Sequence, residues 1–234
     1  MVGRGVYNHV VIREHHLPVT RTARYFTLGE MGEGVRDVWF GCHGYGQLAA
    51  GFVRHLEPLA DPHRLVVVPE ALSRFYLGDH TQPAGPHSKV GASWMTRDDR
   101  LTDIADYVAY LDTLYDSIFT AISRERVTVH ALGFSQGTAT ATRWLVTGRS
   151  RADRLILWGA PLPADLDLKG DGRRLRDLDL TLVAGERDQF LTPKVLSGDE
   201  TRLKDAGIPY RLVRFAGGHE IDGGTLRRLA DTQT

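Results

Sequence analysis

Short apolar runs alternate with helix-period segments along most of the chain, and this alternation limits the folds that are open to it. Runs rich in Val, Ile, Leu and aromatic residues are strand candidates, at 35–44, 64–70, 126–134, 154–160, 179–186 and 210–217. Segments with apolar residues at helical spacing lie between or after them, at 47–60, 101–122, 136–147, roughly 193–206 and from Thr225 onward. This order predicts an α/β fold with a mostly parallel central sheet and helices on both faces.

The N-terminal region departs from this alternation. Segments 6–13 and 20–28 both have β-branched and aromatic content, with Pro18 between them, which predicts an antiparallel N-terminal hairpin ahead of the parallel strands. The stretch 160–178 between two later strands is too short to hold a helical cap domain. We therefore expect one α/β domain over residues 1–234, without a large cap.

Charge and cysteine content narrow the classes of partner. The 29 Lys and Arg residues balance the 29 Asp and Glu residues, so nothing in the charge favours nucleic acid or an anionic membrane surface. A net charge near zero mildly favours self-association, which leaves a homodimer open. Cys42 is the single cysteine, which fits a cytoplasmic protein. The chain shows neither an apolar signal-peptide stretch nor the roughly 20 apolar residues of a membrane span, so we expect no stable membrane insertion.

The pentapeptide Gly133-Phe134-Ser135-Gln136-Gly137 stands where a strand pattern ends and a helix pattern begins. It matches G-x-S-x-G, in which a sharp strand-to-helix turn exposes the serine hydroxyl at the end of the strand. Both glycines are needed because side chains there would collide with the neighbouring strand and helix. Ser135 is therefore a candidate nucleophile. The alternative is a glycine-rich turn in which Ser135 only caps the helix.

A serine nucleophile needs a base, and the base needs an acid that orients it. In this arrangement the chain order is serine, acid, histidine, each after a later strand. Asp188 and His219 each come just past one of the late strands, so both fall at the same carboxyl edge of the sheet as Ser135. We expect these three residues to form a catalytic triad. Asp188 could instead be a helix cap or the partner of Arg187, with Glu186 as the acid. The alternative for His219 is a plain surface-loop position.

An acyl-transfer site also needs N–H donors for the tetrahedral oxyanion. One candidate is the backbone N–H of Gln136, which follows the candidate nucleophile. The other is the backbone N–H of Tyr45, in an H-G-x-G loop that follows an earlier strand. We expect His43 to hold this loop by hydrogen bonding rather than to act as a base. The alternative is a glycine turn with no donor role.

Five motifs, taken together, resemble one branch of a known superfamily. In chain order they are HGYGQ, ASWM, LGFSQG, AGERD and GGHEID, within residues 38–222. They look like the phospholipase/carboxylesterase (acyl-protein thioesterase-like) family of the α/β-hydrolases. The resemblance implies the triad and oxyanion donors named above, and hydrolysis of carboxylic esters or thioesters without a cofactor or metal. The substrate is not carried over, because RFYLGD and SWMTRDDR in the 71–100 stretch depart from the family pattern.

The 71–100 stretch shows no clear period, and a loop of this length inside a compact domain is usually functional or disordered. Its aromatic residues argue against disorder. The candidate walls of an open pocket for an apolar acyl chain are Tyr45, Phe75, Tyr76, Trp94 and Met95. The same side chains would equally suit a core beneath a long loop.

Two interpretations compete with hydrolysis. The stretch 44–49 fits G-x-G-x-x-A after a strand, and Glu70 ends the next strand about 20 residues on, as in a dinucleotide-binding module. That interpretation leaves the order of serine, aspartate and histidine unexplained. The other is a catalytically silent α/β-hydrolase scaffold that acts by binding.

Two other catalytic chemistries are weaker. The histidine pairs that a metal hydrolase could use are His15 with His16 and His80 with His87, and both lack ligand spacing with a nearby carboxylate helix. A thiol catalyst would use Cys42 with His43, but we expect Cys42 to pack inside its strand.

Overall fold

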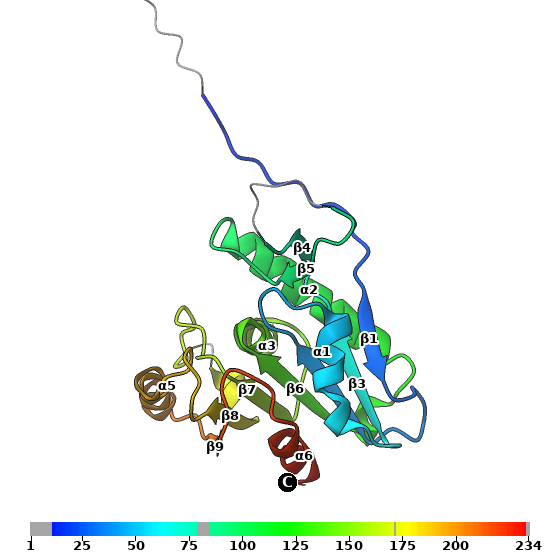
Figure 1. Cartoon of the computed structure of the whole chain (residues 1–234), viewed down its shortest axis with the longest axis vertical. Helices are drawn as coiled ribbons and strands as arrows, with labels where there is room; N and C mark the ends of the chain where they lie inside the picture. The colour runs from blue at the N-terminus through cyan, green and yellow to red at the C-terminus, as the bar shows by residue number, and fades with distance from the viewer. Residues whose placement is uncertain (1–10, 79–84, 171, 233–234) are drawn as a thin grey trace, which may run out of the picture.

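A seven-stranded mixed sheet forms the centre of the computed structural model, which describes residues 11–78, 85–170 and 172–232 (Figure 1). The strand order is β1-β3-β2-β6-β7-β8-β9, and all neighbours are parallel except the antiparallel pair β1 and β3. The strands are β1 Tyr25–Leu28, β2 Asp37–Cys42, β3 Arg64–Pro69, β6 Thr128–Phe134, β7 Arg154–Trp158, β8 Asp179–Gly185 and β9 Arg211–Phe215. The predicted α/β class with a mostly parallel sheet is confirmed.

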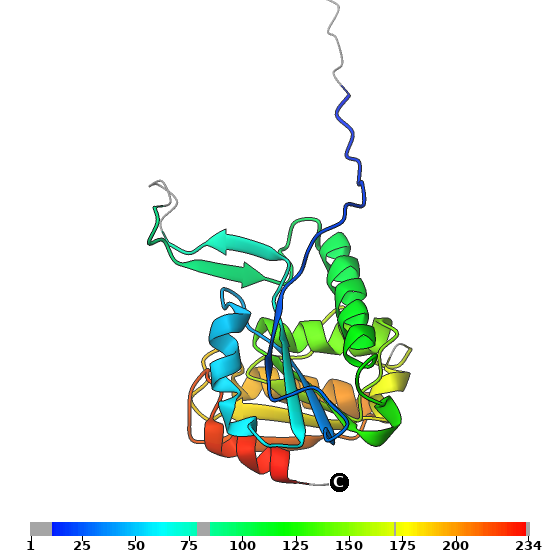
Figure 2. The same cartoon turned by 90° about the vertical axis from the view of Figure 1, so that its right-hand side faces the viewer.

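Helices cover both faces of this sheet (Figure 1, Figure 2). They are α1 Ala49–His55, α2 Arg100–Ile118, α3 Gln136–Thr147, α4 Arg173–Arg176, α5 Pro193–Asp205 and α6 Gly223–Asp231, with 3₁₀ turns at Glu57–Leu59 and Arg124–Arg126. One apolar cluster joins α2, α3, α4 and α5 to the sheet, and a second joins α1 and α6 to the opposite face. Strand β2 serves both clusters, because Phe40 faces the first and Trp39 the second. Burial on both faces explains why these strands are almost continuously apolar.

A separate antiparallel hairpin occupies part of the 71–100 stretch, for which the sequence showed no regular structure. Its strands are β4 Ser73–Tyr76 and β5 Val90–Ser93, and Figure 2 shows the pair standing away from the main body. Strand β5 is tied to the loop after β2, because Gly46 N–H donates to Ala92 O (2.9 Å) and Ala92 N–H donates to Gln47 O (3.2 Å). Strands of four residues are too short for their alternation to stand out in the sequence.

The antiparallel strand expected at the N-terminus is present as β1, but its partner differs from the prediction. Residues 11–24 form no strand, and residues 6–10 of the expected first strand lie outside the described residues. Strand β1 pairs instead with β3, in a register that places Leu28 opposite Val66. The predicted 6–13 to 20–28 pairing is therefore wrong over its described part. A hairpin partner would be exposed on the sheet edge, whereas β3 offers β1 a buried apolar strand.

The connection between β7 and β8 contains only the short helix α4 within the described residues, which agrees with the predicted lack of a large cap. Across the same described ranges, no helix is both long and apolar enough to cross a bilayer.

The carboxylate of Asp112 on α2 holds the far end of α3. It accepts hydrogen bonds from Ser150 Oγ (2.6 Å), Arg149 N (2.8 Å), Trp144 Nε1 (3.0 Å) and Ser150 N (3.1 Å). Burial disfavours the charged form, but the hydrogen bonds from Ser150, Arg149 and Trp144 outweigh it and hold the pKa of Asp112 below its usual value. The ionised carboxylate therefore stabilises the folded chain.

We expect Asp112→Ala to lower the free energy of unfolding by about 3 kcal/mol, because it leaves several buried donors unpaired. The matched control is Asp116→Ala, one turn along α2, which removes only an exposed contact with Arg149 and should change stability by less than about 0.5 kcal/mol. Urea denaturation measures both. The contribution of Asp112 is present above the unfolded pKa of about 3.9 and is lost as the pH falls through the lower folded value. Equal losses in the two variants at pH 7 would contradict this role.

Candidate active site

Ser135 lies at the turn between β6 and α3 with backbone angles φ 53° and ψ −120°. In the described ranges only Ser135 and Asp99 are non-glycine residues with positive φ, a conformation that is strained for a side-chain-bearing residue. The flanking glycines make the turn possible. A Cβ on Gly133 would stand 2.3 Å from Gly137 O, and one on Gly137 would stand 2.0 Å from Cys42 O. The expected sharp strand-to-helix turn is therefore present.

Asp188 and His219 meet at the carboxyl ends of β8 and β9. His219 Nδ1 lies 2.9 Å from Asp188 Oδ2, and the aspartate side chain is buried. The other carboxylate oxygen accepts from the backbone N–H of Phe190 (2.8 Å) and Leu191 (3.2 Å), so the acid is fixed by its own loop. A carboxylate accepts and does not donate, so Nδ1 carries the hydrogen, and in the neutral imidazole Nε2 is the nitrogen with the lone pair.

The Asp–His pair sits beside the serine turn. The His219 ring packs on Phe134, the residue before Ser135, with ring centroids 4.9 Å apart. The same ring contacts Phe190, with ring centroids 4.6 Å apart. Ser135 is half-buried, and its hydroxyl has no hydrogen-bond partner among the residues described. The three predicted triad residues are thus brought to one edge of the sheet.

Gly159, directly after β7, is a site residue that the sequence analysis did not single out. Its φ is 71°, and a Cβ there would lie 3.2 Å from Asp188 Oδ2 and 3.2 Å from His219 Nδ1. A larger residue would press on the hydrogen bond between them. A glycine directly after a strand that ends at the same edge was the available signal.

The loop after β2 packs against the serine turn. A Cβ on Gly44 would lie 3.1 Å from Ser135 Cβ, so the backbone at residues 43–45 passes next to the hydroxyl-bearing residue. Within the described chain, neither the Tyr45 N–H nor the Gln136 N–H donates to a protein acceptor. Both N–H groups are therefore without a hydrogen-bond partner in the described structure.

His43 is part of the structure of this loop. It is buried, its Nε2 accepts from Ala71 N (3.1 Å), and its Nδ1 donates to Gly44 O (2.8 Å). Burial lowers the pKa of His43 below its ordinary value, against a smaller opposing effect of the bond to Gly44. Trp94 Nε1 also donates to His43 O (2.8 Å). These contacts are those expected of a neutral, loop-holding histidine.

The side chain of Gln136 makes contacts that the sequence analysis did not predict. Its Oε1 accepts from Trp94 N (3.0 Å), and its Nε2 donates to Met95 O (2.9 Å) and Ser93 Oγ (3.1 Å). The amide therefore fastens the end of β5 to the start of α3. Because β5 also binds the loop after β2, this amide links the candidate oxyanion loop and the serine turn. Only a contact between segments about 40 residues apart reveals it.

The predicted pocket residues do not share one surface. The tilted rings of Phe75 and Tyr45 contact each other with centroids 5.2 Å apart, and Tyr76 is exposed. Trp94 is buried in the core, while Met95 is half-buried with its sulfur 3.5 Å from Arg143 Nη1. Trp94 lines a cavity of about 730 Å³ between α2 and the N-terminal segment, whose lining contains no triad residue.

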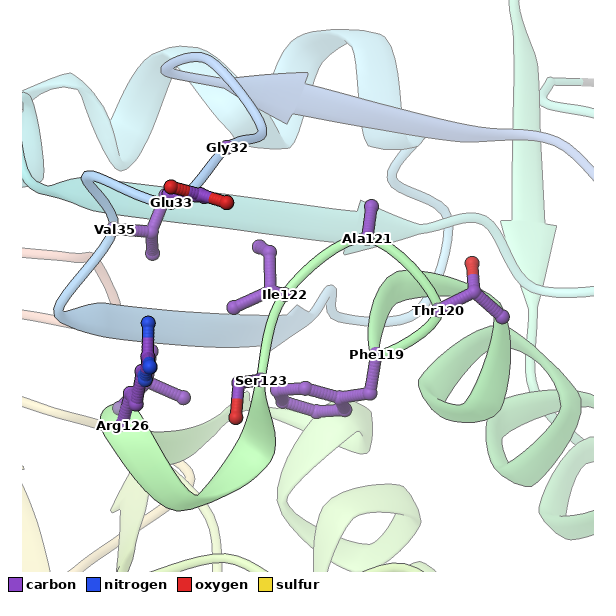
Figure 3. A pocket seen from close by; sticks show the side chains of 10 residues that line it. Gly32, Glu33, Val35, Phe119, Thr120, Ala121, Ile122, Ser123 and Arg126 are labelled. Carbon is purple, nitrogen blue, oxygen red and sulfur yellow. The ribbon is translucent and has the colours of Figure 1, made fainter.

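A smaller cavity of about 300 Å³ lies at the opposite edge of the sheet, where the turn before β2 meets the connection from α2 to β6 (Figure 3). Gly32, Glu33 and Val35 line one side, and residues 119–123 with Arg126 and Val127 line the other. Strands β2 and β6 begin near this cavity, and β6 ends directly before Ser135. The cavity and Ser135 therefore lie at opposite ends of the strands.

The competing acid and thiol do not match the geometry. Glu186 is exposed, and its backbone N–H is engaged by Phe215 O (2.9 Å), whereas His219 is bonded to Asp188. Burial raises the pKa of the Cys42 thiol to about 12, so it stays protonated at neutral pH and is a poor nucleophile.

The dinucleotide interpretation fails at Glu70. This carboxylate is buried and accepts from Arg24 Nε (2.6 Å), Arg24 Nη2 (2.9 Å) and Arg74 Nη1 (3.3 Å). It also accepts from Ala49 N at the start of α1 (3.2 Å). The carboxylate that would have to bind a ribose hydroxyl is therefore already occupied by hydrogen bonds within the protein.

The histidines considered for a metal do not form a buried centre. His80 lies outside the described residues, and His87 belongs to no cluster of ligand type found within them. His16 approaches Glu14 and Asp99 with ligand atoms within 4.8 Å of one another, but all three residues are exposed. An exposed group of this kind forms readily without an ion.

Comparison with known proteins gives the fold. No family model matches the chain, and no curated protein matches it. Esterase PE8 aligns over 90% of this chain and 97% of its own, with a TM-score of 0.66 and 18% identity. Acyl-protein thioesterase 2 from Zea mays aligns over 89% and 96% (TM-score 0.67, 17% identity), and a carboxylesterase from Mesorhizobium loti over 90% and 95% (0.66, 17%). The chain has the α/β-hydrolase fold, and the resemblance drawn from its motifs is confirmed at that level.

We expect Gly137→Ala to lower the free energy of unfolding by more than about 2 kcal/mol, because its methyl group would overlap Cys42 O. The matched control is Gly51→Ala in α1, where a Cβ meets nothing within 4 Å. That change should raise stability by about 0.5–1 kcal/mol, since glycine is a poor helix former. Thermal and urea unfolding check both signs, and a neutral Gly137→Ala would contradict the packing described.

Proposed function

We propose that this chain is a serine hydrolase of the phospholipase/carboxylesterase type that cleaves carboxylic esters or thioesters of small to medium acyl groups. The observation that carries the proposal is the bond of 2.9 Å between His219 Nδ1 and Asp188 Oδ2, held beside a serine in a strained turn. The fold shared with esterases and an acyl-protein thioesterase supports the same reaction class.

The proposed reaction has two halves, acylation of Ser135 and hydrolysis of the acyl-enzyme, and His219 transfers protons in both. His219 Nε2 takes the Ser135 proton as the hydroxyl oxygen attacks the acyl carbonyl, and Asp188 stabilises the imidazolium that forms. The leaving alcohol or thiol then receives that proton. Water, deprotonated by the same imidazole, cleaves the acyl-enzyme and returns the serine.

The tetrahedral oxyanion would rest on the free backbone N–H groups of Tyr45 and Gln136. Gln136 N lies at the first turn of α3, where the helix dipole also favours negative charge. The packing of Gly44 against Ser135 supports this assignment, because it holds the two donor segments on the same side of the turn. The reaction as drawn needs protein groups, an ester and water, and no cofactor enters it.

The remaining sequence-based expectations belong to the same proposal. The partner is a small-molecule ester rather than a nucleic acid, in a cytoplasmic protein that is able to form a homodimer. Tyr45 and Phe75 contact each other. We include both in an apolar surface next to the proposed oxyanion loop, where the acyl chain of the substrate would lie.

We expect Ser135→Ala to reduce kcat/KM for p-nitrophenyl esters by about 10⁴-fold or more, because the remaining groups cannot form an acyl-enzyme. A panel of acyl lengths and labelling with a fluorophosphonate measure this. The unchanged protein should label, and the variant should not. Equal activity in the variant, or no activity in the unchanged protein with any ester or thioester, would favour the silent-scaffold alternative.

The choice of acid is tested by a matched pair of substitutions. We expect Asp188→Asn to reduce kcat by about 10⁴-fold, because an amide no longer fixes the Nδ1–H tautomer of His219. Glu186→Gln alters an exposed carboxylate two residues away and should leave kcat within about twofold. Reversal of the two effects would assign the acid to Glu186.

We expect Gln136→Ala to lower kcat about 10- to 100-fold with little change in KM, because it frees the end of β5 and loosens the oxyanion loop while keeping the backbone donor. Steady-state kinetics with one p-nitrophenyl ester separate the two constants. Thr140→Ala, one turn further along α3, is the control and should leave kcat near its original value. A change in KM alone would contradict a positioning role.

A further inference from the structure

A polar cavity of about 670 Å³ lies at the amino ends of the central strands, opposite the edge that carries Ser135. Residues at or next to strand starts line it, including Arg64 of β3, Thr128 and His130 of β6, and Arg154 of β7. Ala230 is its one apolar lining residue among those described. A cavity of this size is in the range that holds a small molecule, and its lining selects a polar one.

Arg154 supplies the innermost donors of this cavity. It is only 2% exposed, and its Nη1 donates to Leu229 O (3.0 Å) and Thr232 O (3.3 Å). Its Nη2 is buried and has no hydrogen-bond partner in the described structure. A buried guanidinium N–H without an acceptor is costly, so this group lacks an oxygen partner.

The negative charge nearest Arg154 is shared. Asp179 Oδ2 lies 3.0 Å from Arg154 Nε and 2.6 Å from Arg211 Nη2, so one carboxylate oxygen serves two arginines. Burial, and next the charge of Arg211, lower the pKa of Arg154 against the opposing effect of Asp179. One carboxylate therefore faces two guanidinium groups.

Further cations line the same cavity. The side chain of Arg64 is 10% exposed. Its Nη1 donates to Leu59 O (2.9 Å), its Nη2 lies 3.8 Å from Asp37 Oδ2, and its Nε is buried without a partner among the described residues. Arg126 is exposed, and its side chain forms no hydrogen bond or ion pair with the described residues; it also lines the neighbouring cavity of Figure 3.

Carboxylates face the cavity as well, but they do not outnumber the arginines. The charged lining residues are Arg36, Arg64, Arg126 and Arg154 against Asp37, Asp61 and Asp231. Asp37 is engaged by His130 Nε2 (3.2 Å), and burial lowers the pKa of His130, so this histidine adds no positive charge at neutral pH. Arg154 Nη2 and Arg64 Nε are buried donors without an acceptor among the described residues, and the lining has four arginines against three aspartates. A bound oxyanion would supply both the missing acceptor oxygens and the missing negative charge.

We propose that this cavity binds a small polar molecule that carries a phosphate group, with Arg154 and Arg64 as inner donors and Arg126 at the mouth. Guanidinium groups bind phosphate oxygens through paired N–H donors, and three of them can engage the several oxygens of one phosphate. The volume leaves room for a hydroxylated carbon chain beside it. The site is separate from the proposed esterase centre and does not depend on it.

The test uses the whole chain with glycerol 3-phosphate as the probe, glycerol as the uncharged counterpart, and potassium chloride to match ionic strength. We expect saturable binding of glycerol 3-phosphate by isothermal titration calorimetry, a rise in Tm that glycerol and chloride do not give, and competition by inorganic phosphate. Ser135→Ala should bind the probe as the unchanged protein does, because Ser135 stands at the other edge of the sheet.

Two arginine substitutions locate the binding. Arg126→Ala removes an exposed side chain without an internal partner, so it should fold normally and weaken binding at least about 10-fold. Arg21→Ala, which removes an exposed arginine of the N-terminal segment, should leave the affinity unchanged. The proposal is overturned if glycerol 3-phosphate gives no saturable signal, if glycerol binds equally, or if both variants bind alike.

Discussion

The close approach of α3 to the end of β2 is the contact on which the site depends. Gly137 lies so near the carbonyl oxygens of Cys42 and His43 that a Cβ would stand 2.0 and 2.8 Å from them. The chain can enter α3 at this depth only through a sharp turn, and Ser135 occupies the positive-φ position of that turn. Such a conformation costs about 1–3 kcal/mol. It persists because neighbouring strands fix both ends: Ser135 N–H donates to Trp158 O (2.9 Å).

Strand register then decides what stands beside the turn. Cys42 pairs with Gly133, Phe134 with Trp158, and Gly185 with Phe215, so five parallel strands end at the same edge. The loops that follow carry the candidate oxyanion donor, the serine, the aspartate and the histidine. No long-range flexibility is needed to assemble them, because each residue follows its strand by only a few positions. Rigid strands therefore do the positioning that short loops alone could not do.

Much of this was predictable because it rests on local patterns and on one rule of parallel sheets. The apolar runs mark the central strands, and the order of Ser135, Asp188 and His219 places them at one edge. The pairing of β1 with β3 and the β4–β5 hairpin were not predictable, because both depend on contacts between segments that are distant in sequence or too short to show a period. The amide of Gln136 is hidden for the same reason: its partners lie about 40 residues away.

At the amino edge of the sheet, two largely buried arginines have fewer acceptors than donors. In sequence, Arg64 and Arg154 look like ordinary polar strand boundaries, which a solvated edge would tolerate. In the fold they are largely withdrawn from water, and a buried ion pair seldom stabilises a protein more than apolar packing of the same volume. Asp179 cannot satisfy Arg154 fully while it also holds Arg211. Stability alone therefore does not account for these arginines, whereas an anion bound between them would supply the oxygens that the protein itself leaves out.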